Sequence, residues 1–598
     1  MAQCTPVGGL GKPLAYHSVM THRTTAHFLL EGLVELGIDY LFCNLGTDHA
    51  SIIEELARWQ AEGRKHPEVI LCPHENVAIH MAGAYAAVTG RGQAVLVHVD
   101  AGTANAAMGM HNLFRSRLPV LLMAGRSPHT LRGELPGSRD NYVHFVQDPF
   151  DIASLVRPYL KWEYNLPSGV VVKEALRRAY TVMHSEPRGP AYMTLPRETL
   201  AESWPDSDIQ AFDEARFGAV CPRGLTRAQA HEVAGRLLQA KHPIVVTSYL
   251  GRNPAAVALL QELAQSCGIA VYESSPTYLC MPRSSPCFAG FDPTAGLREA
   301  DVGLLLDVDV PWLPKYVKTN PQTHWTLLDT DALKENFPMW GFAAHERYSV
   351  DCATALADVL DAVKTMREGH PGFTAAVATR VANLVEMRSG RLRSAQEAAT
   401  DAGQPDALSA AHVCAAINRA LRPDDVVVNE AIRNTLNVLN QIQRDAPLTL
   451  LSSAGGGLGY SGGMALGAKL ALKHAGSSQR VIQIVGDGGF HFSTPSSVYA
   501  VAQQYGLPLL TVVLDNGGWQ AVKEATLRVY PDGVAAQSGQ FQAQLAGEIR
   551  DFAMVGQAFG AHGETVRDPA GLEQALARCL KAVDAGRAAV LVVRIKPL

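Results

Sequence analysis

Two hydrophobic segments of the chain each end in a residue that can offer a side-chain oxygen to a metal ion. The segment "RVIQIVGD" ends in Asp487, and "LPLLTVVLDN" ends in Asn516. Both have the continuous apolar character of strands that are covered on both faces of a parallel sheet. Because the carboxyl ends of such strands face one crevice, we expect Asp487 and Asn516 to converge there. Magnesium takes carboxylate and amide oxygens together with phosphate oxygens, so this pair predicts a magnesium site.

The residues around Asp487 suit a phosphate group. Gly486, Gly488 and Gly489 surround the acid and expose backbone N–H groups, and a helix is expected to begin soon afterwards at "STPSS". No Lys or Arg lies between Asp487 and Asn516, so a metal ion would have to offset the phosphate charge. The simpler interpretation is that the Asp-Gly and Asn-Gly pairs are two unrelated turns.

A glycine-rich turn precedes this region and allows a different interpretation. In "LTLLSSAGGGLGYSGGMALGAKLALKHAG", a strand, a turn and a helix ending at Gly476 are expected, and Gly457, Gly459 and Gly462 satisfy G-x-G-x-x-G. With Asp487 at the end of the next strand, this pattern is typical of a nicotinamide-dependent dehydrogenase. The motif alone is weak, because any tight strand-to-helix turn favours glycine.

A carboxylate occurs in a comparable position near the N-terminus. In "ILCPHENVAIHMAGAYAAVTG", Glu75 follows a strand and opens a helix expected over residues 75–89, which Gly90 closes. By itself, Glu75 is explained as an acidic residue that favours the N-terminus of a helix.

Taken together, these segments resemble a known family. "GDG", 27 intervening residues and then Asn516 resemble the diphosphate and magnesium motif of thiamine diphosphate enzymes of the acetolactate synthase, benzoylformate decarboxylase and benzaldehyde lyase type. The resemblance implies that Asp487, Asn516 and the backbone carbonyl of Gly518 hold magnesium. It also implies that Glu75, which stands in the dipeptide "HE" as in this family, activates the cofactor by contacting the cofactor's aminopyrimidine ring. The residues implied to contact the cofactor are Glu75, Asn105, Gly457, Leu458, Gly486, Gly488, Gly489 and Asn516.

Finer matches extend the resemblance over nearly the whole chain. "GGLG" matches the turn in which a leucine, here Leu458, bends the cofactor, and "HFVQDPFDIASLVRPYLKW" matches a segment that carries an active-site glutamine, here Gln147. His49, Asp48 and His491 lie where relatives place acid or base groups. Of these three, His49 is our candidate catalytic residue beside Glu75 and Gln147.

The resemblance implies an enzyme that cleaves or forms a carbon–carbon bond next to a carbonyl. Its substrate would be a small 2-oxo acid, 2-hydroxy ketone or aldehyde, and the protein would be a homodimer or homotetramer. A 2-hydroxyacyl-CoA lyase of the same family is an alternative, and a degenerate relative without the chemistry is another. "DAGTAN" stands where the family has "GPGATN", and the segment after "GDG" is two residues longer than in the family. Because of these differences, we do not assign the substrate of any one relative to this protein. FAD or an adenine nucleotide is possible in the centre of the chain, but no motif supports either.

The elements that must position these residues alternate between strands and helices. "EVILC", "QAVLVHV", "LPVLLMAG", "HPIVVTSYLG", "GIAVYES", "DVGLLLDVDV" and "THWTLLDTD" are expected strands. This alternation predicts three doubly wound α/β domains with mainly parallel sheets. We assign residues 1–205 to a pyrimidine-binding domain, 206–395 to a central domain and 396–598 to a diphosphate- and magnesium-binding domain. The polar stretch "MRSGRLRSAQEAATDAGQPDALS" is expected to be a linker.

Composition agrees with a globular enzyme of this kind. The 598 residues are 47% hydrophobic and 18% charged, with a net charge of -5 and no basic run, which excludes an obvious nucleic-acid or anionic-membrane surface. Neither a signal peptide nor a run of ~18 apolar residues is present. The ten cysteines are dispersed and suggest reduced thiols, so we expect a cytoplasmic protein.

Overall fold

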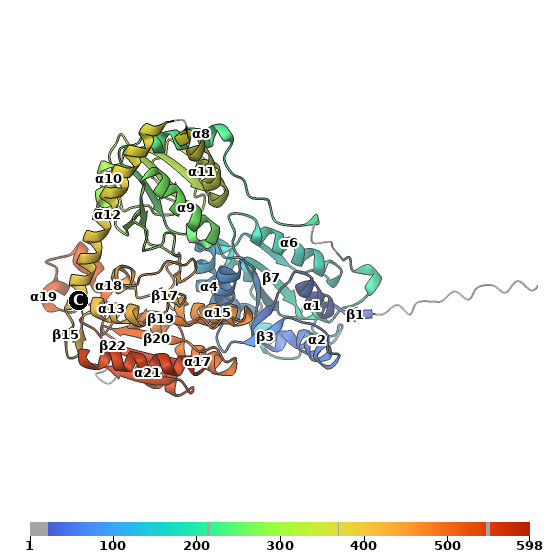
Figure 1. Cartoon of the computed structure of the whole chain (residues 1–598). Coiled ribbons are helices and arrows are strands. Elements are labelled where there is room, and N and C mark those ends of the chain that lie inside the picture. The colour runs from blue at the N-terminus through green and yellow to red at the C-terminus, as the bar shows by residue number, and fades with distance from the viewer. Residues whose placement is uncertain (1–21, 212–215, 369, 546–550, 598) are drawn as a thin grey trace, which may run out of the picture.

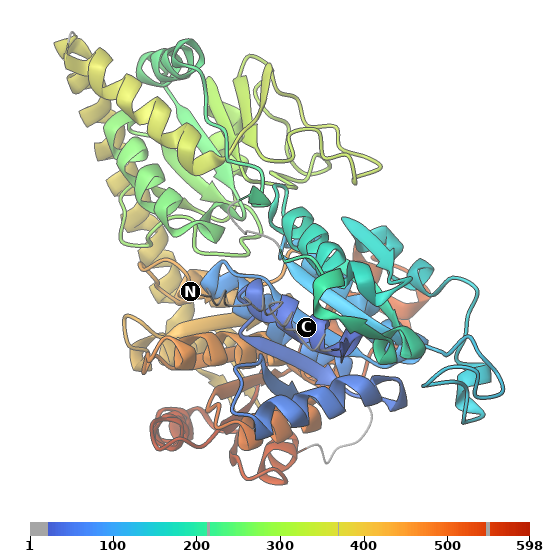
Figure 2. The same ribbon diagram turned by 90° about the vertical axis from the view of Figure 1, so that its right-hand side faces the viewer.

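The chain folds into three α/β domains, each built on a parallel six-stranded sheet (Figure 1). The computed structural model describes residues 22–211, 216–368, 370–545 and 551–597. The central domain lies above the other two, which contact each other (Figures 1 and 2). The predicted fold class, with three doubly wound domains, is confirmed.

The N-terminal domain carries the strands before Glu75 and Asn105. Its sheet contains, in spatial order, β3 (Glu68–Leu71), β2 (Tyr40–Asn44), β4 (Gln93–Val97), β5 (Val120–Arg126), β7 (Ala191–Pro196) and β6 (Trp162–Asn165). Its main helices are α1 (Thr25–Glu35), α2 (Ala50–Ala61), α3 (Glu75–Thr89), α4 (Val99–Arg115), α5 (Val143–Val146), α6 (Val172–His184) and α7 (Arg197–Ala201). A short antiparallel pair, β1 (His22–Thr24) and β8 (Ser203–Pro205), joins the two ends of this region.

The central domain repeats the architecture. Its sheet contains β11 (Phe288–Gly290), β10 (Ala270–Glu273), β9 (Pro243–Thr247), β12 (Val302–Leu306), β13 (His324–Asp329) and β14 (Glu346–Ser349). Its helices are α8 (Arg227–Gln239), α9 (Pro254–Cys267), α10 (Thr294–Glu299) and α11 (Cys352–Glu368).

The C-terminal domain carries the strands that precede Asp487 and Asn516. Its sheet contains β18 (Leu450–Leu451), β17 (Val426–Glu430), β19 (Val481–Gly486), β20 (Leu510–Asp515), β22 (Ala589–Arg594) and β21 (His562–Val566). Its helices are α13 (Ala410–Ala420), α14 (Thr435–Gln441), α15 (Tyr460–His474), α16 (Asp487–Phe492), α17 (Pro495–Gln504), α18 (Gln520–Val529), α19 (Val534–Ser538), α20 (Phe552–Gln557) and α21 (Leu572–Asp584).

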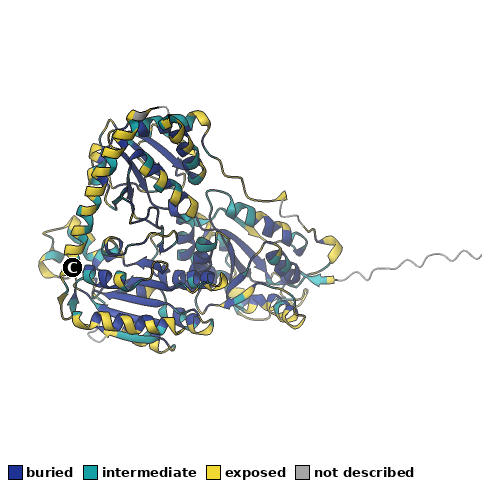
Figure 3. Cartoon of the chain, viewed as in Figure 1, coloured by how far each residue is buried: buried dark blue, intermediate teal, exposed yellow. Residues whose placement is uncertain are grey.

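The sheets are buried on both faces, which explains their apolar sequences. Every residue of β4 and β20 is buried, and the helices outside the sheets carry the exposed surface (Figure 3). The N-terminal and C-terminal domains meet where α3 packs against α15, because Val77 and Met81 share one core with Tyr460 and Met464. The helices that begin at Glu75 and just after the glycine-rich turn are therefore packed together.

The expected linker is not a flexible connection. The helix α12 (Pro371–Thr400) runs through most of it and continues down from the central domain to the C-terminal domain (Figure 1). Arg388 donates to the carbonyl of Arg283 in the central domain, and Gln441 donates to the carbonyl of Ala395 on the helix. The stretch does link the two domains, as predicted, and it does so as a helix because it is rich in Ala, Arg, Glu and Gln, which are strong helix formers as well as polar residues.

Two further observations concern membrane-spanning helices and the state of the cysteines. Across the part of the chain that the structure describes, no helix is both long and apolar enough to cross a membrane. The nine described cysteines are free thiols, and all but Cys221 are buried.

Candidate active site

Asp487 and Asn516 lie together at the carboxyl edge of the C-terminal sheet. They directly follow β19 and β20, which are adjacent and parallel, with Gly486 beside Leu514. A pocket of about 520 Å³, open to solvent, lies over this edge. Seven of the residues expected from the sequence line it, namely Leu458, Gly486, Asp487, Gly488, Gly489, Asn516 and Gly518. The expected convergence is thus present, although a helix, α16, begins at Asp487 itself and not only at the "STPSS" segment, where Thr494 makes no side-chain cap.

Asp487, the Asn516 amide and the Gly518 carbonyl converge in this pocket, and three oxygen atoms meet there in one of the two orientations of the amide. The side-chain oxygen of Asn516 lies 3.2 Å from Asp487 Oδ1 and 2.9 Å from the carbonyl oxygen of Gly518. Both side chains are buried, and Asp487 accepts from the N–H groups of Gly488 and Gly517. Rotating the Asn516 amide would replace the oxygen–oxygen contacts with hydrogen bonds. A hard cation resolves the same contacts and uses the kind of ligands that magnesium prefers, so the residues fit a magnesium ion.

The glycine-rich turn does not provide a dinucleotide site. The N–H groups at the start of α15 are taken by Glu430, which accepts from Gly459 N at 2.5 Å, Ser461 N at 2.9 Å and Ser461 Oγ at 2.5 Å. A pyrophosphate would need the same N–H groups, so the dehydrogenase interpretation fails at this helix. Leu458 faces the pocket, whereas Gly457 packs against α4.

Glu430 is a residue of the site that the sequence analysis did not identify. It ends β17, is fully buried and lines the pocket, and burial raises its pKa to about 7. Its position at the carboxyl end of a buried parallel strand, in "VVVNE", is the signal that would have identified it.

Glu75 is held in a fixed position by two amide groups. It is the first residue of α3 and is only 5% exposed. Asn44, at the end of β2, donates to Oε1 at 2.8 Å, and Asn105 on α4 donates to Oε2 at 3.0 Å. Asn105 was expected from the sequence, and Asn44 was not.

A second polar group occupies the same edge of the N-terminal sheet. His98 directly follows β4, and its Nδ1 lies 2.5 Å from Asp48 Oδ1 while its Nε2 lies 2.9 Å from Gln147 Oε1. Both ring nitrogens face acceptors, which suits the doubly protonated ring. The hydrogen bond to Asp48 raises the pKa of His98 above its ordinary value of 6.5, against the opposing effect of burial.

The two histidines that were expected from the sequence are placed differently. His49 is fully buried, its Nε2 lies 3.2 Å from Asp48 Oδ2, and burial lowers its pKa. His491 is exposed and packs edge-on against Phe552. His98 is therefore the histidine that is partly exposed and hydrogen-bonded to Asp48 and Gln147. It was not among the candidates chosen from the sequence.

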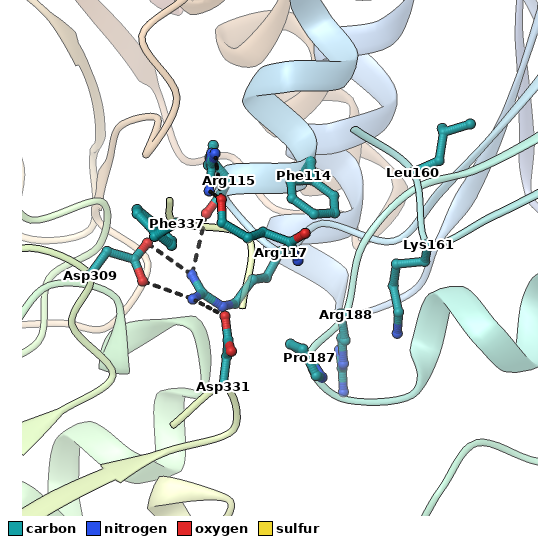
Figure 4. Close-up of a pocket in the computed structure, with 11 residues that line it drawn as sticks. Phe114, Arg115, Arg117, Leu160, Lys161, Pro187, Arg188, Asp309, Asp331 and Phe337 are labelled. Carbon is teal, nitrogen blue, oxygen red and sulfur yellow. Dashed lines mark hydrogen bonds and ion pairs between the residues drawn. The ribbon is translucent and has the colours of Figure 1, made fainter. Parts of the chain in front are cut away.

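The carboxyl edge of the central sheet is filled by paired charges. Lys334 Nζ lies 2.6 Å from Asp329, 2.8 Å from Asp309 and 2.9 Å from the hydroxyl of Tyr249. Arg117 of the N-terminal domain makes two hydrogen bonds to Asp309 in a pocket between the two domains (Figure 4). This edge is where a flavin or adenine nucleotide would lie, and its charged groups already bind one another.

Comparison with known proteins agrees with the geometry. Residues 23–155 match the family model "Thiamine pyrophosphate enzyme, N-terminal TPP binding domain", and residues 434–593 match the corresponding C-terminal TPP binding domain. The chain belongs to the thiamine pyrophosphate enzymes. Thiamine pyrophosphate is thiamine diphosphate, so the expected family and the expected cofactor are confirmed. Members of this family are enzymes whose cofactor serves reactions at carbon–carbon bonds, and the alternative of a nicotinamide dehydrogenase is excluded.

The similar proteins differ in their reactions. The chain is 24% identical to benzoylformate decarboxylase of Pseudomonas aeruginosa over 76% of its length and 80% of that protein. It is 21% identical to acetolactate synthase of Bacillus subtilis, and the match covers 93% of this chain and 91% of that protein. It is 22% identical to oxalyl-CoA decarboxylase of Escherichia coli, and the match covers 82% of each protein. The crystal structure of benzoylformate decarboxylase from Polynucleobacter necessarius has the same fold, with a TM-score of 0.75, 18% identity and coverage of 96% of this chain and all of that one.

Proposed function

We propose that the protein is a magnesium- and thiamine diphosphate-dependent enzyme that cleaves or forms the carbon–carbon bond next to the carbonyl of a 2-oxo acid or 2-hydroxy ketone. The observation that carries the proposal is the set of three converging oxygens from Asp487, Asn516 and Gly518 in the pocket that Leu458 also lines. Such a set suits a divalent cation that in turn binds a diphosphate.

Each half of the cofactor has residues that suit it. Asp487, Asn516 and the Gly518 carbonyl would hold magnesium, and the N–H groups near Gly486, Gly488 and Gly489 would face the diphosphate. When bound, thiamine diphosphate supplies a nucleophilic carbon and an electron sink. Glu75 would hold a proton at the aminopyrimidine end, where Asn44 and Asn105 keep its carboxyl group in place.

His98 is the side chain best placed to move a proton at the substrate. It is partly exposed, and Asp48 behind it stabilises its charged form. Gln147 contacts the opposite ring nitrogen and would orient the ring or contact the substrate itself. We therefore assign the proton transfer expected of His49 to His98. Asp48 contacts the ring of His98, and His49 contacts Asp48.

The two halves of the site lie on different domains, and we infer that they meet across a dimer interface. Every described residue that lines the Asp487 pocket comes from positions 430–522, and no counterpart of Glu75 is among these residues. Large apolar side chains are exposed beside both halves, namely Phe145, Val146 and Phe150 near Gln147, and Ile432, Leu436 and Val522 around the pocket. Two copies of the chain would cover these surfaces and complete two sites, as a homodimer or within a homotetramer.

Cofactor retention tests the proposal. We expect the protein, incubated with thiamine diphosphate and magnesium and then desalted, to release thiamine diphosphate on denaturation, as identified by mass spectrometry. Asp487→Ala should lose this retention because it removes the only charged ligand of the proposed metal site. Asp361→Ala, at an exposed position on α11, is the control and should retain the cofactor. Retention by Asp487→Ala equal to that of the wild type would contradict the metal assignment.

A further inference from the structure

The glycine-rich loop of the C-terminal domain is bonded to a side chain of the N-terminal domain. The N–H of Gly457 donates to Asn112 Oδ1 at 3.0 Å, and Asn112 Nδ2 donates to the carbonyl of Gly457 at 3.1 Å. One side-chain amide therefore satisfies both backbone groups of one loop residue. Asn112 lies on α4 and is 2% exposed, so these bonds are shielded from water.

The orientation of the Asn112 amide is set by a buried histidine. Asn112 Nδ2 also lies 3.0 Å from His80 Nε2, and His80 Nδ1 lies 2.8 Å from the carbonyl of Asn76. That carbonyl can only accept, so Nδ1 carries the hydrogen and Nε2 is free to accept from Asn112. Burial lowers the pKa of His80 to about 4, which keeps the ring neutral near pH 7. A rotated amide would place its oxygen against two acceptors, so Asn112 has one favourable orientation.

The loop can approach α4 this closely only because it lacks side chains. A Cβ at Gly455 would lie 2.2 Å from Asn112 Oδ1, and one at Gly457 would lie 2.3 Å from Met108 Sδ. Asn76, on α3, makes a further hydrogen bond to the loop, because its amide donates to the carbonyl of Gly459 at 3.0 Å. The residue between these hydrogen bonds is Leu458, which lines the Asp487 pocket.

Helix α4 carries both this contact and the one to Glu75, which in the proposed dimer serves the site of the second copy. Asn105 and Asn112 are two turns apart and lie on similar faces of the helix, so that one holds Glu75 while the other holds Gly457. We propose that Asn112 is a positioning residue that holds the glycine-rich loop, and with it Leu458, in the conformation that binds the cofactor. This inference rests on the proposed function and adds a role for the N-terminal domain of the same chain.

Cofactor affinity tests the inference. We would titrate thiamine diphosphate into the full-length protein at saturating magnesium and follow the fluorescence of its tryptophans, one of which, Trp519, lines the pocket. Asn112→Ala removes the amide, and Asn112→Leu removes it while filling a similar volume. For both variants we expect the dissociation constant to rise about tenfold, equivalent to about 1.4 kcal/mol. Asn320→Ala removes a comparable amide that donates to a backbone carbonyl in the central domain, and it should bind as the wild type does.

A second readout separates positioning from general stability. At saturating cofactor, kcat of Asn112→Leu should stay within about twofold of the wild type, while the cofactor concentration for half-maximal activity rises. A wild-type dissociation constant in Asn112→Leu would overturn the inference and leave the proposed function intact. Absence of thiamine diphosphate binding by the wild type would overturn both.

Discussion

At the scale of single residues, the site combines groups that differ in how firmly they are held. Glu75 receives two amide hydrogen bonds, and Asp487 receives two backbone hydrogen bonds. His98 is fixed by Asp48 and Gln147 but remains partly exposed. The groups that we propose to bind the cofactor are thus buried, whereas the group assigned to the substrate is accessible.

Replacing Glu75 should separate cofactor binding from catalysis. Glu75→Gln keeps the shape of the side chain but cannot hold the proton at the aminopyrimidine, so we expect turnover to fall about 10²- to 10⁴-fold while the cofactor is retained. Steady-state kinetics and mass spectrometry of the released cofactor measure the two effects. Glu54→Gln, exposed on α2, is the control, and unimpaired turnover of Glu75→Gln would remove Glu75 from the mechanism.

The pH dependence of the reaction should report His98. Because the bond to Asp48 raises the pKa of His98 above 6.5, a step in which His98 donates a proton should slow as the pH rises through that value. Asp48→Asn removes the charge that stabilises imidazolium, so this limb of the pH–rate profile should move to lower pH. A profile of Asp48→Asn with the limb unmoved would show that another group is titrating.

At the scale of elements, strand ends and helix starts position nearly every functional group. Glu75 and Asp487 open α3 and α16, while Asn44 and Glu430 end β2 and β17. The long helix α12 joins the central and C-terminal domains and forms most of the expected linker.

A glycine inside α12 offers a test of that helix. A Cβ at Gly390 would contact only the far end of Arg393 at 3.9 Å, so Gly390→Ala should stabilise the protein by about 0.5–1 kcal/mol. Gly268, after α9, has a φ of +65°, and its Cβ would lie 2.7 Å from Arg380 Cβ, so Gly268→Ala should destabilise. Thermal melting of both variants checks the signs, and a lower Tm for Gly390→Ala would contradict a continuous helix.

At the scale of the molecule, three domains are joined by different contacts. The α3 and α15 helices share an apolar core between the outer domains. The N-terminal and central domains are joined by charge, since Arg117 of the N-terminal domain binds Asp309, which Lys334 of the central domain also binds. Charges at such an interface are costly to leave unpaired.

Removing Asp309 should therefore destabilise the protein more than removing a surface acid. Burial by itself would raise the pKa of Asp309, but the ion pairs with Arg117 and Lys334 hold it at about 2. Asp309→Asn leaves both cations without this partner, so we expect a loss of about 3 kcal/mol. Asp151→Asn, which breaks the exposed pair with Arg157, should cost less than about 1 kcal/mol. Equal melting temperatures for the two variants would contradict this view of the interface.

The carboxyl group of Asp309 also predicts how the stability of the protein changes at acid pH. A carboxyl group with a pKa near 3.8 in the unfolded chain and about 2 in the folded one stabilises the fold above about pH 4 and loses that effect as the pH falls toward 2. Asp309→Asn should flatten the decline of the wild-type Tm in this window. A decline of the same slope in both proteins would assign it to other carboxyl groups.

The α/β class, the family and the residues at the ends of the parallel strands could be predicted from the sequence. Continuous apolar strands and the spacing of Asp487 and Asn516 are local patterns, and a parallel sheet brings such strand ends together wherever it forms. Which groups join them from distant parts of the chain could be seen only once the elements were placed in space. Asn44 contacts Glu75 and Asn112 contacts Gly457 from other elements of the fold, His98 and not His49 reaches the surface, and α12 contacts both its neighbouring domains. Such contacts depend on how separate elements pack, which no local spacing records.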